Sequence, residues 1–409
     1  MSGMEAGVVI VGAGHAGGTA AALLRQYGYP RAITLIGDEP IPPYQRPPLS
    51  KAWLKGETDA ASLMLKPESF YAGANIDLIL GAEVTVVRRS AREVELSDGR
   101  TFLYDFLIIA TGARARPLPI PGADLTGVMS LRSAADAEDL KAALGPGKRL
   151  AVIGGGYIGL EAAASARALG AEAVIIEREA HILARVAKPP LSSFFADYHR
   201  ARGVAIEVGA VVEAFEGAAG HVTGVRLAGN RIIACDAVLV GIGLIRNDRL
   251  ARDSGLQCAN GVVVDEAART ADPHVFAIGD VTHRPVSHYD RMFWLESVAN
   301  ALEQARHAAS AIAGRPPPPH EVTWNWSDQY DLKLQIAGLP FDVDYTLVRG
   351  DPASGKFAVF HLKGDVIQAV EAVNAAAEFM AGRQLIAQRR PISRARLADT
   401  AISMKEVAA

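Results

Sequence analysis

Short apolar runs recur along the chain, and two of them pass directly into glycine-rich turns. Val8–Gly17 opens with four apolar residues and ends in glycines, and an alanine- and leucine-rich helix is predicted from Thr19. Leu150–Gly159 repeats this order, and a helix is predicted over Leu160–Leu169. An apolar run bounded by turn residues is typical of a buried parallel strand. The pattern therefore predicts two strand–turn–helix units and an α/β fold.

Both turns have the spacing Gly-x-Gly-x-x-Gly. The glycines are Gly12, Gly14 and Gly17 in the first turn and Gly154, Gly156 and Gly159 in the second. The first glycine of such a turn permits the tight bend, the second lets the backbone approach a pyrophosphate, and the third lets helix and strand pack closely. The helix N-terminus then faces the phosphates. Because one turn cradles one pyrophosphate, the sequence predicts two dinucleotide sites.

An acidic residue is expected after the second strand of each unit, where it binds ribose hydroxyls. In the first unit, the predicted strand Ala32–Ile36 is followed by Gly37 and then by Asp38 and Glu39. We favour Asp38 as the ribose contact, and the alternative is an acidic turn.

In the second unit, the predicted strand Ala173–Ile176 is followed directly by Glu177. A carboxylate there accepts the ribose hydroxyls and repels a 2′-phosphate, which favours NADH over NADPH. Arg178 is the counter-signal, because a neighbouring arginine accommodates that phosphate. Arg185 is a further candidate for a phosphate or adenine contact, with an exposed surface arginine as the alternative.

A proline-rich segment, Pro40–Lys51, lies between the first unit's second strand and a predicted helix. Its prolines stiffen the backbone, so Lys51 can hold a cation at a defined point. A cation near N1–O2 or N5 of a flavin favours the electron-rich reduced form. From composition alone, a solvated lysine on a surface loop is an equal alternative.

Further strand patterns follow at intervals. They are Val84–Val87, the hairpin Glu93–Phe102, Phe106–Gly112, Ala237–Gly243, Val262–Asp265 and His274–Asp280. Asp280 closes the last of these, where it would bond the ribityl chain of a flavin or simply cap the turn. A helix predicted from Ser297 would direct its free N–H groups toward the flavin O2.

After the linker Pro316–Pro319, the pattern changes to closely spaced strands and a helix from Ala375. The strands predicted here are Lys333–Ala337, Tyr345–Arg349, Lys356–Leu362 and Val366–Val373. The predicted organisation is a discontinuous FAD-binding domain (1–113 and 245–319), an NADH-binding domain (114–244) and a C-terminal α+β domain (320–409).

Composition narrows the class of protein. The chain has 409 residues, half of them hydrophobic, and a net charge of −3, so no basic field points to nucleic acid or an anionic membrane. No secretory signal or membrane-spanning apolar run is recognised, and we expect a cytoplasmic protein. The two cysteines, Cys235 and Cys258, are far apart, which argues against disulfide-reductase chemistry. The histidines show no metal-ligand spacing, so no metal is expected.

Several strings now stand in order along the chain: GAGHAG (12–17), YQRPPLSK (44–51), GGGYIGLE (154–161), GIGL (241–244), AIGD (277–280), ESVANALEQARHAA (296–309) and WNWSDQ (324–329). Together they resemble the NADH-dependent ferredoxin reductases of bacterial oxygenase systems, over essentially the whole chain. The resemblance implies a glutathione-reductase-like fold with two Rossmann-like domains and a C-terminal α+β domain. It also implies FAD as cofactor and NADH as electron donor.

The resemblance assigns roles residue by residue. The implied FAD contacts are Gly12, Gly14, Ala16, Gly17, Asp38, Arg46, Lys51, Val84, Arg132, Asp280 and the Val298 backbone. The implied NADH contacts are Gly154, Gly156, Ile158, Gly159, Glu177, Arg185 and Gly243. As catalytic candidates, Lys51 would lie beside the isoalloxazine, Glu161 close to the nicotinamide and paired with that lysine, and Trp326 near the flavin face.

The implied activity is electron transfer from NADH through FAD to a [2Fe–2S] ferredoxin that feeds a cytochrome P450 or a ring-hydroxylating dioxygenase. We expect a monomer or weak dimer with a basic docking face for an acidic ferredoxin. Candidates for that face are Gln388–Arg396, Arg291, Arg306 and Lys333, with a solvated charged surface as the alternative. Two departures from the family pattern are Arg246, where proline is usual, and Ala299, a position that is often proline.

Two other classes of flavoprotein are alternatives. An NADH oxidase or peroxidase would return electrons to oxygen or peroxide, and the peroxide-reducing kind carries a redox cysteine near positions 45–51, where this chain has none. A flavoprotein resembling apoptosis-inducing factor would be expected to carry a targeting segment, a basic surface and C-terminal insertions. None of these is recognised in the sequence.

Overall fold

The computed structural model describes residues 6–408, and contacts among them divide the chain into two compact units. Unit 1 consists of the chain up to Gln45, Ala60–Arg114 and Ile245–Asn325; unit 2 consists of Arg46–Asp59, Ala115–Leu244 and Trp326–Ala409. Residues 1–5, which bear on the expected lack of a secretory leader, lie outside the described part. Among the described residues, no helix is both long enough and apolar enough to cross a membrane.

Unit 1 is built on a sheet whose centre is parallel. β1 (Gly7–Val11) pairs with β2 (Ile33–Ile36) on one side and β6 (Thr101–Ile109) on the other, β3 (Ile76–Ile79) follows β2, and β19 (Val275–Ala277) follows β6. All five residues of β1 are buried, as expected of a parallel strand that is covered on both faces. The predicted hairpin arm and the predicted buried strand after it are one strand, β6.

The first half of β6 extends the same sheet in antiparallel fashion. It pairs with β5 (Glu93–Leu96), which pairs with β4 (Val84–Arg88). Gly99 forms the turn between β5 and β6 at φ +85°, as the Ser-Asp-Gly signal predicts.

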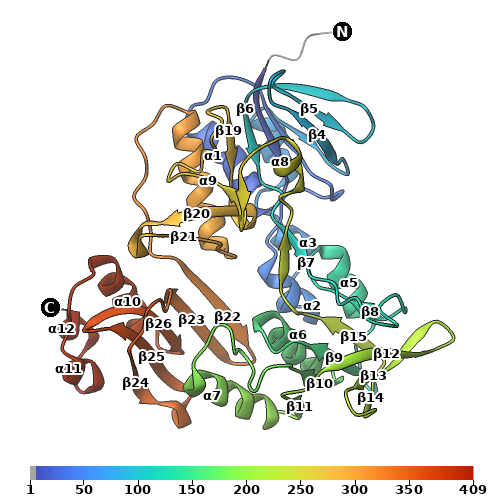
Figure 1. Cartoon of the computed structure of the whole chain (residues 1–409), viewed down its shortest axis with the longest axis vertical. Helices are drawn as coiled ribbons and strands as arrows, with labels where there is room; N and C mark the ends of the chain where they lie inside the picture. The colour runs from blue at the N-terminus through green and yellow to red at the C-terminus, as the bar shows by residue number, and fades with distance from the viewer. Residues whose placement is uncertain (1–5, 409) are drawn as a thin grey trace. The chain divides into compact units, whose positions relative to one another are not determined.

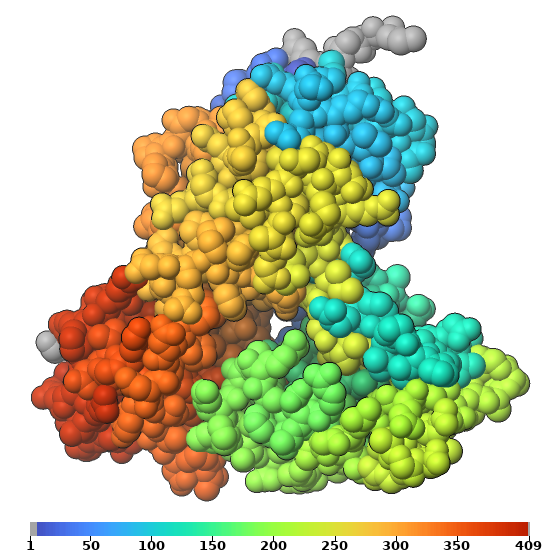
Figure 2. Space-filling model, viewed as in Figure 1, coloured from blue at the N-terminus to red at the C-terminus, as the bar shows by residue number. Residues whose placement is uncertain are grey.

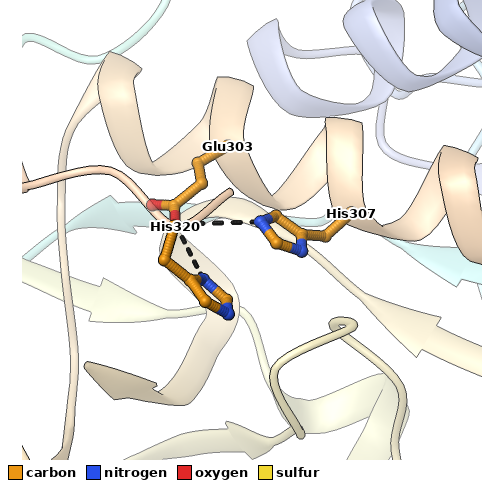
Figure 3. Close-up of side chains that lie close together, drawn as sticks. All are labelled: Glu303, His307 and His320. Atoms are coloured by element: carbon orange, nitrogen blue, oxygen red, sulfur yellow. Dashed lines mark hydrogen bonds and ion pairs between the residues drawn. The ribbon is translucent and has the colours of Figure 1, made fainter. Parts of the chain in front are cut away.

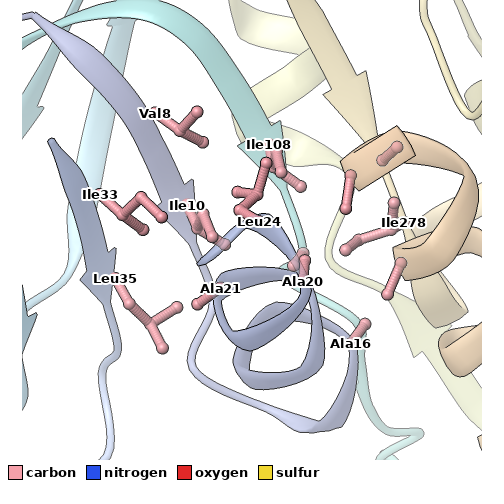
Figure 4. Packing of buried hydrophobic residues seen from close by; sticks show 14 of the residues in the cluster. Val8, Ile10, Ala16, Ala20, Ala21, Leu24, Ile33, Leu35, Ile108 and Ile278 are labelled. Atoms are coloured by element: carbon pink, nitrogen blue, oxygen red, sulfur yellow. The ribbon is translucent and has the colours of Figure 1, made fainter. Parts of the chain in front are cut away.

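The core of unit 1 lies on both faces of this sheet, and alternate strand residues contribute to each face. On one face, α1 (His15–Gln26) and α9 (Val298–Ile312) pack against each other (Figure 1). Small alanines on α1 let the helix approach the strands closely (Figure 4). The labelled residues of this cluster are Val8, Ile10, Ala16, Ala20, Ala21, Leu24, Ile33, Leu35, Ile108 and Ile278. On the other face, Val9, Val11 and Ile109 pack with Ala251 of α8 (Arg249–Asp253).

The rest of unit 1 consists of short elements. A four-stranded sheet has the order β17–β18–β20–β21. Its strands are β17 (Cys258–Ala259), β18 (Gly261–Val263), β20 (Thr282–Val286) and β21 (Arg291–Phe293), and the short helices are α3 (Ala60–Leu63), α4 (Glu68–Gly73), η2 (Gly279–Val281) and η3 (Ser287–Tyr289). Three of the described strands, β7 (Ala113–Ala115), β16 (Leu244–Arg246) and β22 (Trp324–Gln329), cross the sequence borders of the units.

Unit 2 contains a second parallel sheet, of order β11–β10–β9–β15–β8. Its strands are β8 (Val128–Met129), β9 (Arg149–Ile153), β10 (Glu172–Ile176), β11 (Val204–Glu207) and β15 (Ala237–Val240). The associated helices are α5 (Ala134–Ala142), α6 (Tyr157–Ala168) and α7 (Pro189–Arg200). An additional antiparallel sheet, which the sequence analysis did not predict, is formed by β12 (Val212–Ala218), β13 (His221–Leu227) and β14 (Ile232–Ala234).

The C-terminal part of unit 2 is a five-stranded sheet of order β22–β23–β26–β25–β24, with helices after it. The strands are β22 (Trp324–Gln329), β23 (Leu332–Gly338), β24 (Tyr345–Asp351), β25 (Lys356–Lys363) and β26 (Val366–Val373). The helices are η4 (Pro352–Ser354), α10 (Ala376–Gln388), α11 (Arg394–Ala398) and α12 (Met404–Ala408). In the space-filling view these residues, orange to red, form one continuous region (Figure 2).

The proline-rich segment is divided between the two units, and its first half, up to Gln45, belongs to unit 1. Its end, with η1 (Pro47–Ser50) and α2 (Ala52–Lys55), belongs to unit 2. The predicted division into FAD, NADH and C-terminal domains stays a prediction, because the contacts yield two units rather than three parts.

Candidate active site and dinucleotide loops

The first glycine turn forms an open cradle at the start of α1. Gly14 is the N-cap of this helix and makes no side-chain cap hydrogen bond. A Cβ placed on Gly14 would meet nothing within 4 Å, whereas one on Gly17 would lie 2.0 Å from the carbonyl oxygen of Gly12. Gly17 is therefore required for packing, and Gly14 borders free space in front of the helix N-terminus. This arrangement fits a pyrophosphate.

The second glycine turn has the same construction in unit 2. Gly156 is the N-cap of α6, again without a side-chain cap, and a Cβ there would meet nothing within 4 Å. A Cβ on Gly159 would lie 2.4 Å from the carbonyl oxygen of Gly154. Ile158 is 41% exposed on the first turn of α6. The cradle fits a second dinucleotide.

Glu177 follows β10 and faces the second glycine turn. Its Oε2 accepts a hydrogen bond from the Gly155 backbone N–H at 2.6 Å, and its Oε1 accepts one from the Glu179 N–H at 2.9 Å. The neighbouring Arg178 is directed to Glu179, with Nη2–Oε1 at 2.9 Å, and 78% of its side chain is exposed. The carboxylate is thus held at the turn, and the competing arginine is paired elsewhere.

Two other predicted nicotinamide-side residues lie together. The guanidinium nitrogens of Arg185 would be 3.5 Å from a Cβ built on Gly243, which has φ +106°. The backbone of the same segment is attached to the glycine turn, because the Leu183 N–H donates to the Gly155 carbonyl at 2.9 Å. Arg185 therefore lies beside Gly243 in the segment that follows β15, and its role as a phosphate or adenine contact stays a prediction.

Lys51 and Glu161 form a buried ion pair in unit 2. The distance from Lys51 Nζ to Glu161 Oε2 is 2.7 Å, and the two side chains are 16% and 4% exposed. Ser50 Oγ also donates to Oε2 at 2.5 Å, and Ser327 Oγ donates to Oε1 at 2.6 Å. Two hydroxyls and an ammonium thus hold both oxygens of this carboxylate in place.

The loop that carries Lys51 is attached to α6 at a second point. Ser165, one turn beyond Glu161, donates from its Oγ to the Ser50 carbonyl at 2.7 Å. Lys51 Nζ also donates to the Pro47 carbonyl at 3.1 Å. The prolines and these bonds fix the ammonium in place, so the interpretation of Lys51 as a freely solvated surface lysine is wrong for this structure.

In unit 1, Asp280 lies in η2, which packs against α9. A Cβ on the neighbouring Gly279 would approach the Ala16 Cβ to 3.0 Å, so this turn lies close to the first glycine turn. Ser297 is the N-cap of α9, and its side chain accepts from the Asn300 N–H at 3.1 Å. Asp280 thus lies in an element that packs against α9, and Val298 is the first residue of α9, which in turn packs against α1.

The remaining predicted flavin residues fall at several places. Asp38 is exposed after β2, while Glu39 accepts a hydrogen bond from the Tyr44 hydroxyl at 2.6 Å. Val84 has its side chain in the core beside Ile36, which leaves only its backbone for a ligand. In unit 2, Arg46 Nη1 donates to the Arg132 carbonyl at 2.5 Å, so these two predicted residues lie together.

Trp326, on β22, is half-buried, one residue before Ser327. Arg246, which stands where the family usually has proline, has a structural role within unit 1, because its guanidinium stacks on the Trp294 ring at 3.7 Å.

The two cysteines are free thiols. Burial raises the pKa of Cys235 to about 11 and also raises the pKa of Cys258, so neither is an activated thiolate.

The structure also brings together Glu303, His307 and His320, to which the sequence analysis gives no role (Figure 3). Their ligand atoms lie within 4.8 Å of one another. The His307 and His320 rings are stacked at 4.5 Å and 10°, so their nitrogen lone pairs lie in separate parallel planes and do not converge on one ion.

The Glu303 carboxylate is already paired in unit 1. It accepts from Arg284 through both oxygens, at 3.0 and 3.2 Å. Burial opposes ionisation of Glu303, but Arg284 outweighs it and the pKa is lowered. Burial, together with His320, lowers the pKa of His307 to about 4. The cluster is an ion pair with a neutral histidine.

The pyridine nucleotide-disulphide oxidoreductase family matches residues 6–308, and the family described as reductase C-terminal matches residues 324–408. The chain belongs to this oxidoreductase family. A probable ferredoxin reductase of Castellaniella defragrans is 51% identical, with 98% of each chain covered. These matches confirm the resemblance and the fold class.

Two solved structures agree over the full length. The putidaredoxin reductase of a covalent putidaredoxin reductase–putidaredoxin complex superposes with a TM-score of 0.96 at 41% identity, covering 98% of both chains. The ferredoxin reductase for the CYP199A2 system from Rhodopseudomonas palustris gives 0.95 at 40% identity, covering 99% of this chain and all of that one. The protein is an NAD(P)H-dependent flavoprotein oxidoreductase, and it is similar over its whole length to ferredoxin reductases.

Sequence reasoning missed the two serines that bind Glu161. Ser50 and Ser327 stand inside the strings PPLSK and WSDQ, so the family resemblance did mark their neighbourhoods. Their contact with Glu161 joins residues 111 and 166 positions apart, which no local pattern reveals.

Proposed function

We propose that this reductase takes electrons from NADH and passes them through FAD to a [2Fe–2S] ferredoxin in the cytoplasm, as a monomer or weak dimer. The ferredoxin would feed a cytochrome P450 or a ring-hydroxylating dioxygenase. The observation that carries the proposal is the buried ion pair between Lys51 and Glu161, in which Glu161 lies on α6, the helix that begins at the second glycine cradle.

Each cofactor has residues that fit it. The first cradle, with Gly12, Gly14, Ala16 and Gly17, would hold the FAD pyrophosphate, and Asp38 or Glu39 its ribose. The second cradle would hold the NADH pyrophosphate. FAD held there would supply the chemistry that links a two-electron hydride donor to a one-electron acceptor.

The protein contributes position and charge rather than acid–base chemistry. Lys51, held by Glu161 and the Pro47 carbonyl, would supply a fixed positive charge on the flavin side. The free N–H groups at the start of α9 would favour negative charge in the same way. Glu161 would keep the ammonium oriented while the nicotinamide lies close by, and Trp326 would cover a flavin face.

The choice of NADH over NADPH rests on Glu177. Its carboxylate is held at the Gly155 N–H, where a ribose would meet it. A 2′-phosphate in that position would face a fixed negative charge. Arg178, which would otherwise favour NADPH, pairs with Glu179.

Part of the predicted basic docking face is engaged within the protein. Arg394 donates to the Gly364 carbonyl at 2.6 Å and Arg396 to the Glu406 carbonyl at 2.8 Å. Arg306 pairs with Glu321 at 2.6 Å. Lys333 is exposed on β23 and remains a candidate ferredoxin contact.

The test is anaerobic reduction of the purified yellow protein by NADH, followed by cytochrome c reduction with and without a [2Fe–2S] ferredoxin. We expect NADH to bleach the flavin and the ferredoxin to raise the rate severalfold, with the gain lost at high salt. NADH consumption that ignores ferredoxin and tracks oxygen would instead indicate an oxidase. Flavin reduction without fast turnover of any acceptor would indicate a module resembling apoptosis-inducing factor.

A further inference from the structure

The Glu161 carboxylate lies at the end of a buried chain of hydrogen bonds that comes from the C-terminal segment of unit 2. Ser327 Oγ donates to Glu161 Oε1 at 2.6 Å, and Gln329 Nε2 donates to Ser327 Oγ at 3.0 Å. The Gln329 Oε1 lies 2.8 Å from His199 Nε2. Ser327, Gln329 and His199 are each at most 1% exposed.

Chemistry fixes the direction of every bond in this chain. The Gln329 amide nitrogen can only donate, so its oxygen is the acceptor that faces His199. His199 therefore carries its proton on Nε2, and its Nδ1 accepts from the Tyr330 hydroxyl at 3.3 Å. Burial lowers the pKa of His199, which agrees with this neutral form. Each donor in turn points toward Glu161.

The two oxygens of Glu161 are held by different parts of the chain. Oε2 accepts from Ser50 and Lys51 of the proline-rich segment, whereas Oε1 accepts from Ser327 of β22. Without Ser327, Oε1 would lose the hydroxyl that binds it while remaining in a nearly closed environment. A buried carboxylate oxygen that loses its donor bears a large desolvation cost.

We propose that Ser327 is a positioning residue for the reductase reaction. By binding Oε1 it holds Glu161 as an oriented anion, so that the carboxylate keeps Lys51 in place, and Gln329 and His199 fix the Ser327 hydroxyl in its donating direction. This inference rests on the proposed roles of Lys51 and Glu161. It adds a specific function to the WSDQ segment of the C-terminal domain.

The experiment compares the holoenzyme variants S327A and S327T with E161Q and with the combination of S327A and E161Q. The readout is the rate of flavin bleaching by NADH in a stopped-flow instrument. We expect S327A to slow bleaching about 10-fold, as for one lost hydrogen bond to a charged group. S327T keeps the hydroxyl and should restore most of the rate.

Rescue by the conservative variant separates positioning from simple damage. S327A should slow bleaching at unchanged flavin content and melting temperature, and S327T, which keeps the donor to Glu161 Oε1, should not. In the E161Q background, S327A should have little further effect. S354A, which changes an exposed serine on η4 of the same module, serves as the matched control.

The outcomes are distinguishable. If E161Q bleaches at the wild-type rate, the proposed role of Glu161 fails, and this inference fails with it. If E161Q is slow but S327A behaves as wild type, or if the two effects add in full, Ser327 does not position Glu161 and only this inference is overturned. Should S327A not retain flavin, S327C takes its place, because it fills the same space with a weaker donor. We then expect the same slowing of flavin bleaching, but by a smaller factor.

Discussion

Glu177 offers the sharpest test of how the second cradle selects its nucleotide. Its two carboxylate oxygens are held by the Gly155 and Glu179 N–H groups, so the charge lies at a fixed place beside the turn. Replacing it in E177Q keeps one oxygen acceptor and the side-chain size but removes the charge. A ribose hydroxyl then loses a charge-assisted hydrogen bond.

The magnitude follows from these contacts. A hydrogen bond to a charged group contributes about 1.5–3 kcal/mol, and a neutral one about 1 kcal/mol, so kcat/KM for NADH should fall about 10-fold. For NADPH, removing a fixed charge about 4 Å from a phosphate relieves about 1–4 kcal/mol of repulsion. The preference for NADH over NADPH should therefore fall about 100-fold in total.

The assay is steady-state reduction of ferricyanide with each nucleotide, because this acceptor does not need the ferredoxin. Flavin content and thermal unfolding check that the glycine turn survives. E213Q is the matched control, because it removes the same charge from an exposed glutamate on β12 of the same unit. A preference that changes less than threefold in E177Q would refute the assignment of Glu177 as the discriminating residue.

Three further predictions concern the first glycine cradle, the His307 side chain beside Glu303, and the Cys235 thiol. G14A adds a Cβ that meets no protein atom within 4 Å, so it should fold normally yet bind FAD about 10-fold more weakly by flavin titration. G17A, with its Cβ 2.0 Å from the Gly12 oxygen, should instead lower the melting temperature by several degrees; equal behaviour of the two would contradict the pyrophosphate role of Gly14. The pKa of His307 is lowered to about 4, below its unfolded value of ~6.5, so stability that is complete above pH ~6.5 is lost as the pH falls toward 4. Urea unfolding of H307Q should therefore lose about 2 kcal/mol less than wild type between pH 7 and 4.5, and parallel curves would disprove the shift. Because burial raises the pKa of Cys235 to about 11, iodoacetamide at pH 8 should leave this thiol unmodified in the native protein, as mass spectrometry would detect.

The glycine turns, their strands and their helices were predictable because their signal is local. An apolar run, fixed glycine spacing and a helix pattern all fall within a short window, and the structure has β1 with α1 and β9 with α6 at those places. The strand Trp324–Gln329 was missed because its sequence does not alternate cleanly between apolar and polar residues.

The two serines that bind Glu161 could not be predicted for a different reason. Ser50 in η1 and Ser327 in β22 lie far from α6 in the sequence, and serines carry no periodic signal. Glu303 and His307 are one helical turn apart on α9, but His320 lies beyond the proline run. Only the fold brings it onto the His307 ring.

The dispersed origin of the Glu161 contacts has a consequence for synthesis of the chain. Ser50 and Lys51 emerge from the ribosome first, and Glu161 follows 110 residues after the lysine, but Ser327 comes 166 residues later still. Loop closure over such separations is slow compared with local helix formation. Throughout translation of the intervening chain the carboxylate therefore lacks the donor for its second oxygen. A nascent or prematurely terminated chain that ends before β22 carries both glycine turns, Lys51 and Glu161, but not the Ser327 hydroxyl that binds Glu161 Oε1.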